Sequence, residues 1–393
     1  MKGDRLLKRL KRLAARGGVY RTLVGLRDRL APRPTLDLAR LTTTGEVPLP
    51  TAFTFEPTLK CNLRCTMCYQ NEYRDKGVKP ELGLEEVRRI LTGFGRHFRR
   101  SYLVGGEVFL RRDFEEVLAL LEAEGIQVFL TSNGTVLPRE RLAALRRFSN
   151  LTGMWFSLDG VGEVHDRIRG PKSFELTLRS LREAKGRFEV GSSFVIMPQN
   201  VHQMLDFARL VASLGIVEVN YQHEIYSTPE ELEASRQWLG WRPDELMVYV
   251  RPKGQPPGFR ETLEANLKRL PALERELKVV TSFEPPVANE RLGDFYAGTL
   301  RDKARLFCRE IDNLRIDPQG NVIFCPYLRK SFGNLLDQPV EAIWNSPELR
   351  RFRVDLLDSN LLPICQRCCK LGLWPRAQPG KAYSSQLPTA AVS

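Results

Sequence analysis

The sequence predicts an α/β fold in which a partial (β/α)6 TIM-like barrel is followed by a small cysteine-rich domain. From residue 52 onward, strand-like segments alternate with helix-like segments of about 10–15 residues, which indicates βαβ units and a parallel sheet. The eight cysteines gather in two groups about 240 positions apart. Polar motifs with glycine directly follow several strands, at the edge where parallel sheets place active sites.

The elements of the barrel follow from hydrophobic periodicity and from the turn residues between segments. The predicted strands are residues 51–57, 101–105, 126–132, 153–160, 188–197 and 217–222. The predicted helices are residues 84–94, 114–125, 139–148, 173–186 and 201–215. Six such units make an open or partial barrel, because a closed barrel of this type needs eight. Further on, we expect a helix at 260–270, short strands near 313–325 and one helix over 340–353.

Composition is that of a globular protein, with 42% hydrophobic and 27% charged residues among 393. The net charge of +13 is concentrated at one end, since residues 1–30 hold ten Lys/Arg and two Asp/Glu. Within them, residues 2–16 have the pattern of a basic amphipathic helix, and prolines at 32–50 indicate a linker. This extension fits an anionic membrane surface, or docking on the chain's own domain or on a partner. Nucleic acid is not expected as a partner, because the rest of the chain is evenly charged.

No stretch of 18 apolar residues occurs, and the basic N-terminus lacks the apolar core of a signal peptide. Clustered cysteines in such a chain indicate metal ligands or redox groups, which the cytosol keeps reduced. We therefore expect a cytoplasmic protein, with residues 1–30 as a candidate for peripheral contact with the inner membrane surface.

The first cysteine group has the spacing CxxxCxxC, formed by Cys61, Cys65 and Cys68 directly after the first strand. Three thiolates on one short loop can hold three irons of a cubane cluster and leave the fourth iron open. A structural zinc site is the alternative, although zinc usually takes four ligands.

This segment resembles the signature of the radical SAM superfamily, which follows the first strand of a partial (β/α)6 barrel. The resemblance implies a [4Fe–4S] cluster on these three cysteines, with S-adenosylmethionine on the open iron. The family usually has an aromatic residue before the third cysteine, whereas this chain has Met67 there and Tyr69 one place later.

Further motifs match the family in order and spacing, and each could alone be a simple turn. The triplet Gly105-Gly106-Glu107 corresponds to the family's GGE motif, which the resemblance assigns to the methionine amino group. Ser132 begins a Ser-Asn-Gly motif after the third strand. Ser157, which begins SLDG after the fourth strand, is a candidate for the ribose hydroxyls, and Arg169 for the methionine carboxylate.

The second cysteine group combines Cys308 and Cys325 with the PICQRCC motif, which contains Cys365, Cys368 and Cys369. By spacing alone, a zinc ribbon is nearly as good a match as an iron–sulfur site. The segment resembles the SPASM/twitch domain of radical SAM enzymes. It has too few cysteines for two auxiliary clusters, so we expect one [4Fe–4S] cluster on Cys308, Cys325, Cys365 and Cys368. Cys369 would be a spare thiol or an alternative ligand.

The expected regions are a basic amphipathic helical extension (1–50), a radical SAM core (51–225), a helical connection (226–300), a SPASM/twitch-like domain (301–375) and a disordered tail (376–393). The resemblance implies an oxidoreductase or maturase that cleaves S-adenosylmethionine reductively and abstracts a substrate hydrogen. A peptide or protein substrate is expected, with a lipid, a sugar or another small molecule as the alternative.

The expected electron donor is a flavodoxin or a ferredoxin. His223 and Glu224, after the sixth strand, are candidate acid or base residues. A zinc-binding interaction protein is the alternative from another functional class.

Overall fold

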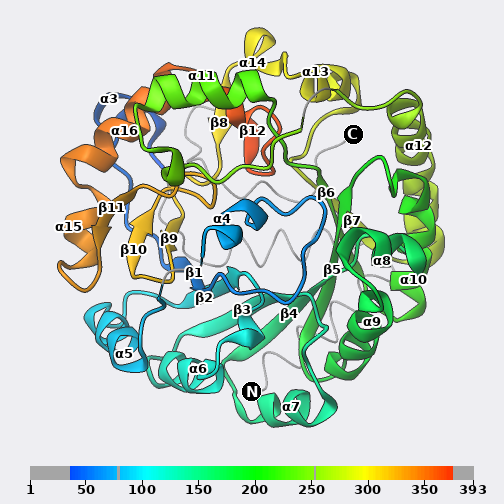
Figure 1. The fold of residues 1–393 in the computed structure, drawn as a ribbon, viewed down its shortest axis with the longest axis horizontal. Coiled ribbons are helices and arrows are strands. Elements are labelled where there is room, and N and C mark those ends of the chain that lie inside the picture. Colours follow the sequence, from blue (N-terminus) through cyan, green and yellow to red (C-terminus); the bar gives the residue numbers. More distant parts are fainter. Residues whose placement is uncertain (1–35, 78–79, 252–253, 375–393) are drawn as a thin grey trace.

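The computed structural model describes residues 36–77, 80–251 and 254–374. Seven parallel strands form the curved wall of the barrel (Figure 1). They are β1 (Ala52–Thr58), β2 (Arg100–Gly105), β3 (Gln127–Ser132), β4 (Leu151–Ser157), β5 (Glu189–Ile196), β6 (Glu218–His223) and β7 (Val280–Glu284). The first six lie where the sequence predicts them. The seventh strand, β7, was not predicted and adds to β6 in parallel.

Helices cover the outer face of this sheet (Figure 1). They are α5 (Leu84–Gly93), α6 (Phe114–Ala123), α7 (Arg139–Ala144), α9 (Ser173–Ala184), α10 (Met204–Ser213) and α12 (Phe259–Leu277). The two faces of each strand differ, because successive side chains point to opposite sides. Phe53, for example, packs on Phe94 and Phe98 beside α5. We call the face turned away from these helices the interior face.

The C-terminal cysteine region is joined to the barrel by the same sheet. Strand β9 (Leu314–Ile316) pairs with β1 in parallel, and β10 (Asn321–Ile323) and β11 (Ser331–Asn334) follow antiparallel. The result is one sheet of ten strands in the order β11-β10-β9-β1-β2-β3-β4-β5-β6-β7. A separate ribbon pairs β8 (Leu306–Cys308) with β12 (Leu371–Leu373). The two predicted domains therefore share a continuous backbone hydrogen-bond network.

Residues 36–50 are not the linker that their prolines suggested. Helix α3 (Leu38–Thr44) packs on α16 (Pro347–Asp358), with Leu41 fully buried. The indole nitrogen of Trp344 donates to the carbonyl oxygen of Val47 at 2.9 Å. Prolines here fix the path of a chain that is held by side chains of the C-terminal domain. The predicted helix at 2–16 and the predicted disordered tail lie outside the described residues.

Two other local predictions need correction. Residues 340–353 form two helices, α15 (Val340–Trp344) and α16, because Ser346 caps the second helix and Pro347 begins it. Proline is suited to this first position since its missing N–H would be unpaired there. Residues Glu163–Arg169 form a helix, α8, that was not predicted.

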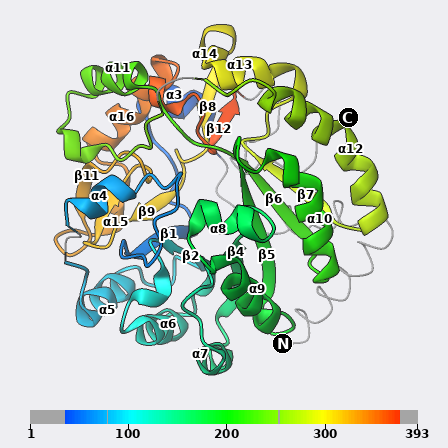
Figure 2. The same cartoon turned by 45° about the vertical axis from the view of Figure 1, so that its right-hand side comes forward.

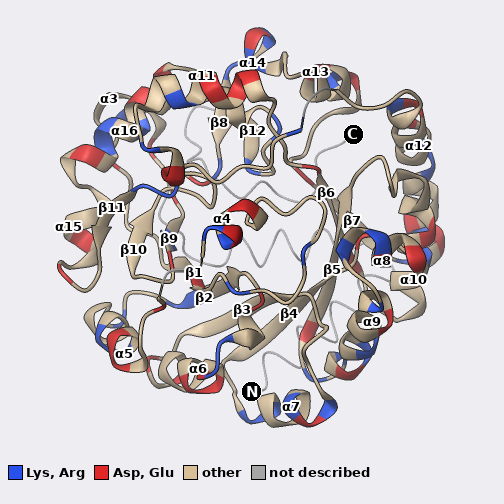
Figure 3. Cartoon of the chain, in the orientation of Figure 1, with Lys and Arg blue, Asp and Glu red and all other residues tan. Residues whose placement is uncertain are grey.

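The remaining helices close the region between barrel and C-terminal domain. They are α11 (Pro229–Leu239), α13 (Leu292–Ala297) and α14 (Leu300–Lys303). The short helix α4 (Asn71–Asp75) lies in front of the middle of the barrel in Figure 1, and in the turned view of Figure 2 it lies in front of the C-terminal domain. The outer helices carry both signs of charge (Figure 3), which agrees with the even charge expected for this part of the chain.

Candidate functional site: two cysteine sites joined by one sheet

The first cysteine group lies on the loop between β1 and α4, at the carboxyl edge of the sheet. Cys65 is buried, and Cys61 and Cys68 are half-buried. The loop is held by backbone hydrogen bonds from Cys68 N to Cys65 O at 3.1 Å and from Thr66 N to Ile168 O at 2.9 Å. Three thiols therefore share one short loop, which is fixed partly by α8.

A side-chain nitrogen lies near each of the three sulfurs. The distance is 3.8 Å in each pair: Asn133 Nδ2 to Cys61 Sγ, Arg169 Nη1 to Cys65 Sγ, and Arg74 Nη2 to Cys68 Sγ. Burial raises the pKa of Cys65 to about 11, and the Arg169 guanidinium opposes that rise. N–H donors and positive charge favour the thiolate form that binds metal. The three nitrogens thus provide the N–H donors and positive charge that would stabilise three thiolate ligands.

Arg169 reaches Cys65 because a buried carboxylate holds it. Its Nε lies 2.5 Å from Oδ2 of Asp159, whose side chain is fully buried. The other oxygen of Asp159 accepts from Val195 N at 2.7 Å. Asp159 is therefore more than the turn residue that SLDG could have been. The contact of Arg169 with a methionine carboxylate stays a prediction, and the described geometry gives it a protein partner.

Gly105 and Gly106 let the end of β2 approach the cysteine loop. Gly106 N donates to Thr58 O at 2.9 Å, and Glu107 N donates to Lys60 O at 2.8 Å. A Cβ on Gly105 would overlap Thr58 O, and one on Gly106 would overlap Lys60 O. These two glycines therefore make room for the backbone of the cysteine loop itself.

Glu107 is fully buried and joins the ends of β2 and β3. Its carboxylate accepts from Ser132 Oγ at 2.9 Å, from Asn133 N at 2.7 Å and from Phe109 N at 3.3 Å. Burial raises its pKa to about 7, against the lowering effect of these hydrogen bonds. Three protein donors already occupy the carboxylate, and Ser132 is one of them. Cofactor contacts of Glu107 and Ser132 therefore remain predictions without support from this geometry.

The second cysteine group lies between β8, the end of β10 and the short helix at Pro363–Cys365. Burial raises the pKa of Cys308 well above its usual range, and the nearby thiols of Cys365 and Cys325 add to the rise. Cys369 hydrogen-bonds to Cys368 and so belongs to the same site. The five thiols of this region are thus brought together from three separate segments.

Buried charges fill the space between the two cysteine sites. Glu56, on the interior face of β1, contacts Arg315 of β9 at 3.0 Å and Arg329 at 2.6 Å. Arg315 also contacts Glu310 at 3.3 Å. Charges this deeply buried must be paired, because removing one partner leaves the other uncompensated. Sequence reasoning missed this cluster because Glu56 lies more than 250 positions before the other three residues.

Comparison with known proteins accounts for both cysteine sites. Residues 55–211 match the radical SAM superfamily, and residues 308–369 match an iron–sulfur cluster-binding domain, SPASM. The chain carries a radical SAM domain and a SPASM domain. Together they imply a [4Fe–4S] cluster, an auxiliary cluster and S-adenosylmethionine, as the sequence predicted.

Relatives of the radical SAM domain have several named activities. Fe-coproporphyrin III synthase from Methanosarcina barkeri is 30% identical over 173 residues, or 43% of each chain. Mycofactocin maturase MftC from Mycobacterium ulcerans is 28% identical over 325 residues, or 77% of each chain. SuiB from Streptococcus suis, bound to the precursor peptide SuiA, has a TM-score of 0.57 at 14% identity, covering 84% of this chain and 71% of its own. The match thus spans less than half the length of the first of these relatives.

The residues of the radical SAM domain fit the implied cluster. The fit rests on the three thiols of one loop and on the nitrogen near each sulfur. In the part of the chain that the structure describes, no three His, Cys, Asp or Glu side chains are placed so that they could hold a single metal ion. The fit is therefore to a cluster and not to one ion. Among the described residues, no helix has the length and apolar character needed to cross a bilayer.

The two candidate acid or base residues are placed differently. His223 points to the outer face, where its Nδ1 lies 2.6 Å from the Tyr296 hydroxyl and its ring packs on Phe295 of α13. This position argues against a catalytic role for His223. Glu224 is buried, and its carboxylate lies 2.6 Å from Arg251 Nη1. Burial raises the pKa of Glu224 to about 7, while Arg251 opposes the rise. Glu224 remains a candidate.

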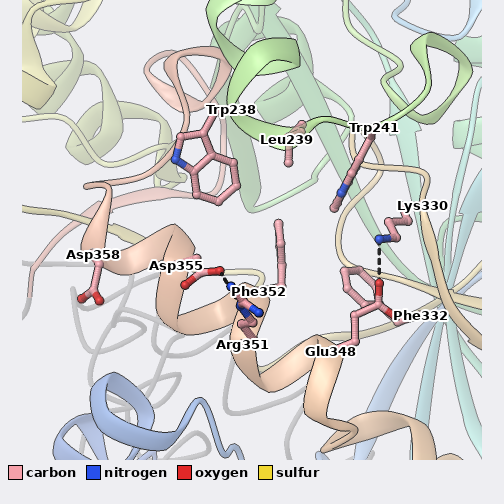
Figure 4. Close-up of a pocket in the computed structure, with 10 residues that line it drawn as sticks. All are labelled: Trp238, Leu239, Trp241, Lys330, Phe332, Glu348, Arg351, Phe352, Asp355 and Asp358. Atoms are coloured by element: carbon pink, nitrogen blue, oxygen red, sulfur yellow. Dashed lines mark ion pairs between the residues drawn. The ribbon is translucent and has the colours of Figure 1, made fainter.

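A groove of about 490 Å³ lies outside the barrel, between α11, β11 and α16 (Figure 4). Trp238, Trp241 and Phe352 line it, and the ion pairs Lys330–Glu348 and Arg351–Asp355 border it. None of its lining residues belongs to either cysteine site. We therefore do not assign the groove to the radical SAM chemistry.

Proposed function

We propose that this protein modifies a peptide or protein substrate by radical chemistry, as a maturase. Cys61, Cys65 and Cys68 would hold the [4Fe–4S] cluster of the radical SAM domain, and Cys308, Cys325, Cys365 and Cys368 the auxiliary cluster. When bound, the first cluster supplies the electron that cleaves S-adenosylmethionine and starts hydrogen abstraction from the substrate. The observation that carries the proposal is the loop on which a nitrogen donor lies near each of three cysteine sulfurs.

The chain's own residues would orient the cofactors and keep water away. Arg169, held by Asp159, would fix one edge of the first site, and the buried Glu107 would fix the strand ends beside it. Ser157 lies at the end of β4, paired with Ser193, and is partly exposed. It is therefore available as the predicted ribose contact. The surrounding low dielectric strengthens each of these charge and dipole interactions.

The peptide substrate is supported by relatives rather than by the site alone. MftC is named a maturase, and the structurally similar SuiB binds a precursor peptide. The second candidate is radical chemistry on a small molecule, which the name of the coproporphyrin synthase relative favours. An electron donor of the flavodoxin or ferredoxin type, and contact of residues 1–30 with the inner membrane, remain predictions.

Anaerobic purification tests the proposal. We expect a brown protein with about eight irons per chain, from two [4Fe–4S] clusters, that forms 5′-deoxyadenosine from S-adenosylmethionine under dithionite. A colourless protein that binds zinc in place of iron would favour a zinc-binding interaction protein and contradict the proposal. Mass spectrometry of peptides incubated with the active enzyme would then separate the two substrate classes.

A further inference from the structure

Three aromatic side chains form a row on the interior face of the barrel. They are Tyr102 on β2, Phe129 on β3 and Trp155 on β4, with ring centroids 6.3 Å and 6.2 Å apart in that order. All three are partly exposed. Their neighbours Leu103, Leu130 and Phe156, on the opposite face, are at most 1% exposed. The row is therefore an accessible apolar surface inside the barrel and does not belong to the buried core.

Two glycines let two of these rings approach the backbone of the neighbouring strand closely. Gly153 is the strand partner of Phe129, and Gly191 is the strand partner of Trp155. A Cβ on Gly153 would overlap the Phe129 ring, and a Cβ on Gly191 would lie 2.6 Å from Cε2 of Trp155. Each of these two rings thus lies over a glycine of the neighbouring strand, where the missing side chain leaves room for it. The result is a row of rings over β2, β3, β4 and β5, in which neighbouring ring planes are tilted by 56° and 54°.

The other half of the interior face is polar, and it also carries carboxylates: Glu189 on β5, Glu218 on β6 and Glu284 on β7 share the inward parity. Ser193 on β5, Asn220 and Gln222 on β6, and Ser282 on β7 point inward, and Asn220 Nδ2 donates to Ser282 Oγ at 3.0 Å. The inward positions of β5, β6 and β7 include no Lys or Arg. The nearby Arg315 is already paired with Glu56 and Glu310. This wall suits peptide amides better than the carboxylates of a tetrapyrrole.

The row also leads to the edge where the radical SAM motifs lie. Trp155 is two residues before Ser157 on the same strand, and its strand partner Thr131 directly precedes Ser132. A group resting on Trp155 would therefore lie below the loop that carries the first three cysteines. This position is what a substrate needs if one of its carbons is to meet a radical formed at that loop.

We propose that Tyr102, Phe129 and Trp155 form a platform that binds an aromatic side chain of the peptide substrate, whose backbone amides face Ser193, Asn220, Gln222 and Ser282. The proposal rests on the maturase function and names its substrate class. Aromatic pairs prefer offset or edge-to-face contacts, which stabilise beyond the burial of area alone. A row of three rings would therefore discriminate an aromatic residue from an aliphatic one.

The test uses the reconstituted full chain with S-adenosylmethionine and two probes, an N-acetylated tripeptide with a central tryptophan and coproporphyrin III. Calorimetry should show saturable binding of the tripeptide and at least tenfold weaker binding to Trp155→Ala. Trp155→Phe keeps a ring and should stay within about threefold of the wild type. Gly191→Ala displaces the Trp155 ring and should weaken binding like Trp155→Ala. Trp238→Ala, in the outer groove, is the matched control and should bind normally.

Three outcomes would overturn the platform: no tripeptide binding to the wild type, equal weakening by Trp155→Ala and Trp238→Ala, or Trp155-dependent binding of coproporphyrin III alone. Iron content and thermal midpoint identify variants that fail to fold. Formation of 5′-deoxyadenosine in the same samples keeps the two proposals apart. If that product forms normally, a failure of binding contradicts only the platform. If no sample forms it, the proposed function itself fails.

Discussion

Tyr69 and Tyr327 meet edge to face, with their ring centroids 4.9 Å apart. Tyr69 follows Cys68 in the chain, and Tyr327 lies two residues after Cys325, close to Cys368 and Cys369. The two cysteine sites are therefore joined by an aromatic contact as well as by the pairing of β1 with β9. This contact gives a physical reason to expect that disturbing one site affects the other.

Replacing Tyr327 tests that connection. Tyr327→Leu should lower the free energy of unfolding by about 2 kcal/mol, because it removes an aromatic contact and leaves a cavity. It should also reduce the iron bound at the auxiliary site. Tyr327→Phe keeps the ring and should retain wild-type iron content. Urea unfolding and iron analysis measure both effects, and equal behaviour of the two variants would argue against the aromatic connection.

Because β2 lies so close to the cysteine loop, replacing Gly106 by a larger residue should strongly destabilise the protein. Gly106→Ala should destabilise the protein by 2 kcal/mol or more (about the cost of overpacking), since its Cβ would overlap the carbonyl oxygen of Lys60. Gly93→Ala is the control, because nothing lies within 4 Å of its Cβ position in α5. That change should be neutral or stabilising by about 0.5–1 kcal/mol. Thermal midpoints of the two variants check the prediction, and similar midpoints would contradict it.

Breaking the buried Asp159–Arg169 pair should lower the free energy of unfolding more than breaking an exposed ion pair does. Asp159→Asn should cost about 3–5 kcal/mol of stability, because it leaves the Arg169 charge buried without a counter-ion. Asp206→Asn breaks an exposed pair with Arg209 and should cost no more than about 1 kcal/mol. Urea denaturation measures both. If Asp159→Asn unfolds at the same midpoint as Asp206→Asn, Asp159 does not hold Arg169 as described.

Glu224 should make stability depend on pH near neutrality. Its pKa rises from an ordinary 4.5 to about 7 on folding, so the folded chain binds the proton more tightly than the unfolded chain. Its stabilising contribution is complete below about pH 4.5 and is lost as the pH rises through about 7. The stability of the wild type relative to Glu224→Gln should therefore fall by roughly 1–3 kcal/mol between pH 5 and pH 8.

Denaturation of both proteins across that pH range gives the difference directly. Glu140→Gln, at an exposed position on α7, is the control and should show no such trend. A constant difference between the wild type and Glu224→Gln would mean that Glu224 is charged throughout.

The sequence predicted the barrel well because each of its first six strands is a short apolar run between turn residues. It missed β7, which has no strongly apolar pattern, and α3, whose flanking prolines indicated a linker. These elements are stabilised by neighbours far away in the chain, such as β6 for β7 and α16 for α3. Local patterns carry little information about such contacts.

In the candidate site, too, features set by local sequence were predicted and features set by distant contacts were not. The cysteines were found from spacing, but Asn133 and Arg74 were not, because their contacts with Cys61 and Cys68 depend on how separate loops meet. The Asn in Ser-Asn-Gly after β3 was an available signal for the first of these. The aromatic platform could not be predicted, since it requires the register that places Gly153 beside Phe129 and Gly191 beside Trp155.

The central claim is that Cys61, Cys65 and Cys68 hold the cluster that cleaves S-adenosylmethionine. The most direct test is anaerobic reconstitution of Cys65→Ala, with iron and 5′-deoxyadenosine measured in the same sample. We predict a fall from about eight to about four irons per chain, because the auxiliary site remains intact, and no 5′-deoxyadenosine above the level without enzyme. Wild-type formation of 5′-deoxyadenosine by Cys65→Ala would contradict the assignment.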